Sequence, residues 1–139
     1  MEEIDIRLLK LYQKGYKCSQ IIILKGLEAR GESNPGLVRA MAGLADGCGS
    51  WRASCGALTA GCCLLALYAG KGSDEETVSE KLGTMLVDLS DWFGERFGDP
   101  TGPMACKTFA GEGCGALVAD TLAKVMEILE ANEFDLTGG

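Results

Sequence analysis

The stretch that decides the fold is SCGALTAGCCLLALYAG, residues 54–70, which carries three cysteines and no charge. A membrane-spanning helix needs about 20 apolar residues, whereas this stretch is shorter and rich in Ala, Gly and Thr. A helix that is apolar on every face, among amphipathic neighbours, is typical of the centre of a helical bundle. We therefore expect a buried central helix at about 55–69 and no membrane span.

Helical patterns separated by glycine precede this stretch. Residues 2–14 repeat apolar side chains at helical spacing, and Gly15 follows as a C-terminal cap. Residues 18–30, CSQIIILKGLEAR, contain three consecutive isoleucines that also fit a strand. Leu24 and Leu27 continue the apolar pattern at helical spacing. We therefore expect a second helix here, with a strand as the alternative for the isoleucine run.

Helix-start signals mark the remaining segments. Asn34 followed by Pro35 is an N-cap with proline at the first helical position. Ser73 and Glu76 have the spacing of a capping box, which predicts that a long fifth helix starts there. The last helix is expected over residues 114–131. Because no segment alternates with a period of two, the sequence predicts an all-α bundle of about six helices.

Length and composition fit one helical, cysteine-rich domain over residues 1–139. The chain is 47% hydrophobic and 24% charged, which is normal for a soluble globular protein. Its net charge of −7 argues against nucleic acid or an anionic membrane as partner. Seven cysteines, an odd number, and an acidic amphipathic N-terminus unlike a secretory leader favour a cytoplasmic protein with reduced thiols.

Six of the seven cysteines fall into two groups. Cys55 and Cys62 share a helix face but lie ~10 Å apart along the axis, too far for a disulfide. Cys62 and Cys63 are adjacent, and a bond between them would be strained, so both are expected to pack in the core. Four other cysteines lie at expected helix starts or at the edge of a loop, namely Cys18, Cys55, Cys106 and Cys114. Basic residues close to them are Lys17, Arg52 and Lys107.

Helix N-termini favour the thiolate, because the helix dipole and unpaired backbone N–H groups stabilise negative charge there. A single cysteine near a cap is usually a packing residue. Four such placements in one chain favour a reactive or metal-binding site instead. The sequence contains no histidine, so any metal site must be built from thiolates and carboxylates.

The segment CGALTAG, with GYKCSQ upstream and FGDPTGPMACKTFAGEGC downstream, resembles the C_GCAxxG_C_C family, whose members are classed as redox-active. The resemblance covers nearly the whole chain and implies that Cys18, Cys55, Cys106 and Cys114 are the four characteristic cysteines. Ala60 stands at the position of the motif's final glycine, and Gly61 follows it. A similar domain occurs in split-Soret cytochromes in association with an iron–sulfur centre. This chain has neither a C-x-x-C-H sequence nor a histidine, so no c-type haem is expected.

Two functions follow, and a third reading is weaker. In the first, Cys55 is an attacking thiolate, one of the other three characteristic cysteines resolves the mixed disulfide, and a redox protein is the partner. In the alternative, the four thiolates hold an iron–sulfur cluster or a metal ion. In the third, a helical partner-binding domain uses its cysteines only for packing. A homo-oligomer is left open, and the resemblance names no substrate.

Overall fold

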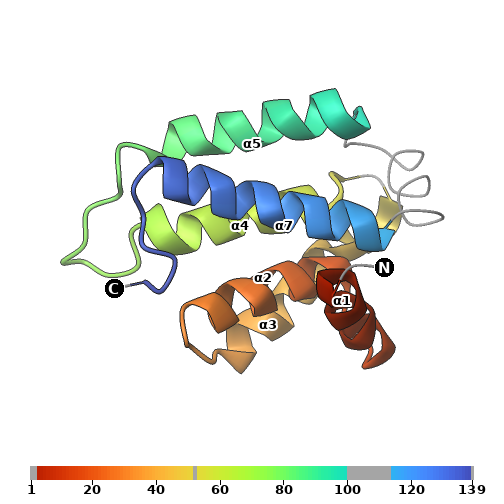
Figure 1. Cartoon of the computed structure of the whole chain (residues 1–139). Helices are drawn as coiled ribbons and strands as arrows, with labels where there is room; N and C mark the ends of the chain where they lie inside the picture. The colour runs from red at the N-terminus through yellow and green to blue at the C-terminus, as the bar shows by residue number, and fades with distance from the viewer. Residues whose placement is uncertain (1–2, 52, 100–113, 139) are drawn as a thin grey trace.

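The structure is a computed structural model that describes residues 3–51, 53–99 and 114–138, with side chains for 6–50, 53–99 and 116–138. All regular structure within these ranges is helical, which confirms the all-α prediction (Figure 1). The α-helices are α1 (Glu3–Gln13), α2 (Cys18–Ala29), α3 (Pro35–Met41), α4 (Gly56–Ala69), α5 (Leu82–Phe97) and α7 (Cys114–Ala131). A short 3₁₀ turn, η1 (Ala42–Leu44), and an irregular turn, η2 (Gly47–Trp51), connect α3 to α4. No helix in these ranges is both long and apolar enough to cross a membrane.

Helix α4 is the central helix that the uncharged stretch predicts. It packs against α2, α5 and α7, and η1 also contacts it. Leu64 and Leu65 are fully buried because these neighbours cover adjacent faces of the helix. Two glycines bring the helices close. A Cβ atom on Gly26 of α2 would overlap the Leu64 side chain, and one on Gly61 of α4 would lie 3.0 Å from Leu89 Cδ2 of α5.

The isoleucine run is helical, as expected. Ile21, Ile22 and Ile23 are all fully buried inside α2. A helix can bury three consecutive side chains when it is covered on several sides, and α2 contacts α1, α3, α4 and α7. The start of α3 also follows the sequence signal, since the Leu37 N–H donates to Asn34 Oδ1 at 3.1 Å.

The predicted start of the fifth helix is wrong. Residues 71–81 form turns, and α5 begins only at Leu82. Glu76 Oε1 accepts from the Gly72 N–H at 2.5 Å, on the N-terminal side of the expected helix. The Ser79 N–H donates to the Ala69 carbonyl at 2.8 Å, so the segment folds back on the end of α4. Val78 lies in this segment, outside the helix, and is accordingly 49% exposed.

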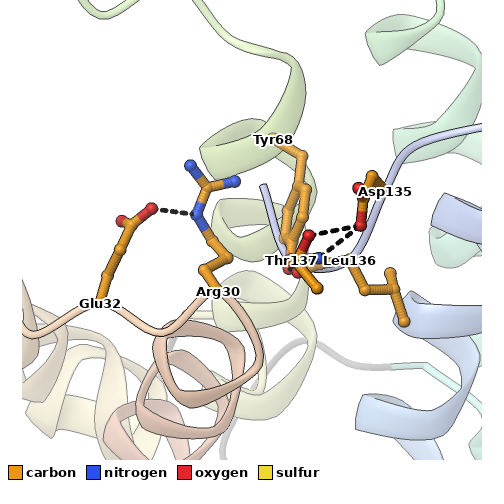
Figure 2. Close-up of polar contacts among 6 residues, drawn as sticks. All are labelled: Arg30, Glu32, Tyr68, Asp135, Leu136 and Thr137. Atoms are coloured by element: carbon orange, nitrogen blue, oxygen red, sulfur yellow. Dashed lines mark hydrogen bonds and ion pairs between the residues drawn. The ribbon is translucent and has the colours of Figure 1, made fainter. Parts of the chain in front are cut away.

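The C-terminal segment closes one end of the bundle (Figure 2). The Tyr68 hydroxyl, near the end of α4, donates to the Leu136 carbonyl at 2.6 Å. The Arg30 guanidinium lies 4.6 Å from the centre of the Tyr68 ring and pairs with Glu32 at 3.0 Å. This cluster joins the ends of α2 and α4 to the residues that follow α7.

Three helices begin at the opposite end of the bundle. Figure 1 shows that α2, α4 and α7 all begin at this end, and the three helices contact one another. The positive ends of three helix dipoles therefore point to one region. Cys18 and Cys114 are the first residues of α2 and α7, and Cys55 directly precedes α4.

Candidate functional site at the helix N-termini

Cys18 is held at the start of α2 by local hydrogen bonds. The Lys17 N–H donates to Gln20 Oε1 at 3.0 Å, which fills one of the donors that a helix start leaves unpaired. Gln20 Nε2 in turn donates to the Val38 carbonyl of α3 at 3.1 Å. One residue further, the buried Ser19 hydroxyl donates to the Met41 carbonyl at 2.7 Å. These bonds fix the backbone around Cys18, whose side chain is half-buried.

Cys55 occupies the N-cap position of α4. Its backbone is extended, with φ −50° and ψ 130°, and its carbonyl accepts the first helical bond from the Thr59 N–H at 3.1 Å. The Thr59 hydroxyl also donates to this carbonyl at 3.3 Å. The residue is only 4% exposed. The cysteine therefore lies at a helix start, as the sequence predicts, but inside the protein surface.

Gly56, the first residue of α4, lies against the sulfur atom of Cys18. A Cβ atom on this residue would lie 3.2 Å from Cys18 Sγ and 2.8 Å from the Leu44 carbonyl oxygen. The sulfur of Cys18 thus lies against the first turn of α4, beside the residue that follows Cys55. Only glycine leaves this space, which gives a physical reason for the C-G sequence at the start of the motif.

A left-handed turn precedes the site and is tied to it. Four consecutive residues, Asp46 to Gly49, have positive φ angles between 56° and 78°. Asp46 pairs with Lys17 at 3.6 Å, so the turn is joined to the start of α2. The positive charge expected from Lys17 beside Cys18 is therefore partly offset by a carboxylate. Cys48, which sequence reasoning left out, lies in this turn with an exposed side chain and φ 58°. Glycines on both sides of it are the signal that could have marked the turn.

The other members of the predicted site are described only in part. Cys106 and the basic residues Arg52 and Lys107 lie outside the described residues. Cys114 begins α7, and its backbone is at the same end of the bundle as Cys18 and Cys55 (Figure 1), while its side chain lies outside the described set. Whether the four sulfurs meet therefore stays a prediction.

The prediction that Cys62 and Cys63 both pack in the core is wrong for Cys63, which is exposed, and only partly right for Cys62, which is half-buried. Burial raises the pKa of the Cys62 thiol, Cys63 beside it raises that pKa further, and a hydrogen bond with Ser90 lowers it. Burial also raises the pKa of Cys63. Raised pKa values keep both sulfurs protonated, so neither resembles an activated nucleophile.

Among the side chains that the structure describes, no group of three or more Cys, Asp or Glu side chains is placed to hold a metal ion. Cys18 Sγ lies against Gly56, the residue that follows Cys55, and cysteine ligands suit an iron–sulfur cluster or zinc.

An all-helical fold with cysteines at the N-termini of α2, α4 and α7 defines the class, a helical cysteine-rich protein. A family model described as "Putative redox-active protein (C_GCAxxG_C_C)" matches residues 16–128, a range that includes Cys18, Cys55, Cys106 and Cys114. The chain belongs to the C_GCAxxG_C_C family of redox-active proteins. Comparisons with curated proteins and with solved structures found no match. Gly61 follows the position at which the motif has its final glycine. Because Gly61 has no side chain, α4 can lie close to Leu89 of α5 and Val125 of α7 at this residue.

Proposed function

We propose that this protein transfers electrons by thiol–disulfide exchange, with Cys18 and Cys55 as its reactive pair. The observation that supports this is the position of Cys18 Sγ against Gly56, the residue next to Cys55. Both cysteines lie at helix N-termini, where the dipole and backbone N–H groups stabilise a thiolate. Membership of a redox-active family agrees with this chemistry.

Burial suggests the order of the two steps. Cys18 is half-buried and Cys55 is 4% exposed, so an incoming disulfide reaches Cys18 first. The sequence alone favoured the reverse order, with Cys55 attacking. In the proposed order, the Cys18 thiolate attacks a disulfide of a partner protein, forming a mixed disulfide and releasing one partner thiolate. The Cys55 thiolate then attacks Cys18 Sγ, which closes the Cys18–Cys55 disulfide and releases the second partner thiolate. The partner's disulfide is reduced by two electrons, and the cysteine pair is oxidised by two.

Cys106 and Cys114 are proposed to complete the site as the remaining family cysteines. A second candidate function is supported by the three helices, α2, α4 and α7, that begin with or directly after a cysteine at one end of the bundle. An iron–sulfur cluster held by Cys18, Cys55, Cys106 and Cys114 would supply one-electron transfer. The helix dipoles at this end would offset part of the negative charge of the four thiolates.

The exchange reaction is tested with an aromatic disulfide, 5,5′-dithiobis(2-nitrobenzoate), as the partner. With Cys55→Ser, we expect the thionitrobenzoate adduct to stay on Cys18, where peptide mass spectrometry locates it. With the unmodified chain, we expect the adduct on Cys18 to be short-lived and a Cys18–Cys55 disulfide to replace it. Cys63→Ser is the control and should change neither outcome, because Cys63 lies seven residues beyond Gly56 on α4. An adduct on Cys18 that persists in the unmodified chain would contradict the proposal.

The cluster is tested by purification without oxygen. Iron and acid-labile sulfide that remain bound, together with a brown colour, would favour the second candidate. A colourless protein without iron or sulfide would contradict the second candidate.

A further inference from the structure

Helix α1 carries a second amphipathic face that is turned away from the bundle. Leu8 is buried at 1% exposure, whereas Ile6 and Leu9 are 43% and 45% exposed. Lys10 and Lys14 are also exposed, and the Lys14 N–H donates to the Lys10 carbonyl at 3.1 Å, which continues the helical turn. Ile6, Lys10 and Lys14 therefore follow one another at intervals of four residues, in one row.

Helix α5 carries the same row with the opposite charge. Val87 is 57% exposed, and Asp91 and Glu95 follow at intervals of four, both exposed. Asp88 adds a further carboxylate beside this row. In the part of the chain that the structure describes, no basic side chain forms an ion pair with Asp91 or Glu95.

The two rows match in spacing as well as in charge. Rows of residues at i, i+4 and i+8 align with one another when two helices cross at about 50°, the commonest packing class. In the register that pairs the charges, Ile6 would lie beside Val87, Lys10 beside Asp91, and Lys14 beside Glu95. The apolar contact would bury two of the most exposed large hydrophobic side chains that the structure describes, and two ion pairs would flank it.

The two rows cannot meet within one chain. Figure 1 shows α5 and α1 on opposite sides of the bundle, with α4 and α7 between them. Helix α1 instead packs on α2 and α7 of its own chain. We propose that the outer row of α1 in one copy docks on the outer row of α5 in a second copy of this chain. The proposal does not depend on the redox function.

Two helix faces form an interface at the low end of the size range of specific contacts. Weak self-association is therefore expected, with Kd on the order of 100 μM. The net charge of −7 on each copy adds long-range repulsion, which also keeps the association weak.

Sedimentation velocity on the full chain, over a series of concentrations around that Kd, tests the proposal. Lys10→Glu/Lys14→Glu and Asp91→Lys/Glu95→Lys should each weaken self-association at least ~10-fold, because like charges then face each other. An equimolar mixture of the two variants should regain association, since each acidic α1 then finds a basic α5 and each basic α1 an acidic α5. Glu75→Lys/Glu80→Lys, in the exposed 71–81 segment, is the matched control and should not lose association.

The folding of each variant is checked by circular dichroism, and the neutral pair Lys10→Gln/Lys14→Gln provides a milder second variant that should also weaken association. A chain that stays monomeric at ten times the expected Kd would overturn the proposal. Self-association that survives both charge reversals belongs to another surface and would also overturn it. Folded variants that lose association but do not regain it when mixed would show that the α1 row and the α5 row do not face each other, and would also overturn the proposal.

Discussion

Replacing Gly56 by alanine tests whether the start of α4 is closely packed against Cys18 and η1. The added Cβ would lie 2.8 Å from the Leu44 carbonyl oxygen, 3.2 Å from Ala45 Cα and 3.2 Å from Cys18 Sγ. Two of these neighbours are backbone atoms, so the clash cannot be relieved by rotating a flexible side chain. Overpacking of this kind typically costs about 1–3 kcal/mol. Alanine recovers at most about 1 kcal/mol of helix propensity, and less at a helix start.

We therefore expect Gly56→Ala to lower the free energy of unfolding by about 1–2 kcal/mol. Urea unfolding followed by circular dichroism measures this change. Gly94→Ala in α5 is the matched control, because a Cβ atom there has no neighbour within 4 Å. The control should raise the free energy of unfolding by about 0.5–1 kcal/mol. The reasoning would be refuted if both substitutions stabilised the protein, because the first turn of α4 would then have room for a side chain.

Four further outcomes are expected. Gly26→Ala should lower the free energy of unfolding, despite alanine's better helix propensity, because the added Cβ would overlap the Leu64 side chain. An unchanged free energy of unfolding in urea would show that this contact is loose. Ser19→Ala should lower the free energy of unfolding by about 1 kcal/mol by removing the buried bond to the Met41 carbonyl, and an unchanged unfolding midpoint would argue against that bond. Burial raises the pKa of Tyr68. The contribution of Tyr68 to stability is therefore complete below about pH 10, the pKa of an exposed tyrosine, and is lost as pH rises through the higher folded-state pKa. The free energy of unfolding of Tyr68→Phe should depend less on pH above about 10 than that of the unmodified chain, and an equal dependence in the two proteins would reject this prediction. Ser90→Ala should raise the pKa of Cys62 further, because the substitution removes the hydrogen bond that lowers this pKa. The pH profile of Cys62 alkylation, measured by mass spectrometry, should then shift to higher pH, and an unchanged profile would contradict the prediction.

The sequence predicts much of the fold because apolar periodicity and caps report directly on helices. The last helix spans Cys114–Ala131, as expected, and Asn34 caps α3 through its side chain. The central position of α4 follows from its lack of charge. The start of the fifth helix was predicted too early because Ser73 and Glu76 satisfy the capping pattern, while their hydrogen bonds stabilise turns instead. A local pattern cannot show that Ser79 bonds to Ala69, which lies in another element.

The candidate site is harder to predict than the fold. Helix-start signals place Cys18 and Cys55 at dipole ends, but the contact between Cys18 Sγ and Gly56 depends on the packing of α2 against α4. Burial is likewise a tertiary property, so the low exposure of Cys55 and the exposure of Cys63 could not be read from residue type. The left-handed turn at Cys48 depends on four successive backbone angles, of which the sequence signals only the two glycines.

Disulfide mapping of the oxidised protein tests the central claim most directly. The full chain is purified without oxygen, oxidised with a dithiol–disulfide couple, and digested without reduction under conditions that prevent exchange. The account predicts that the first disulfide to form joins the peptide that contains Cys18 to the peptide that contains Cys55. A first disulfide that excludes either residue, or oxidation that leaves both as thiols, would contradict the claim that these two cysteines are the reactive pair.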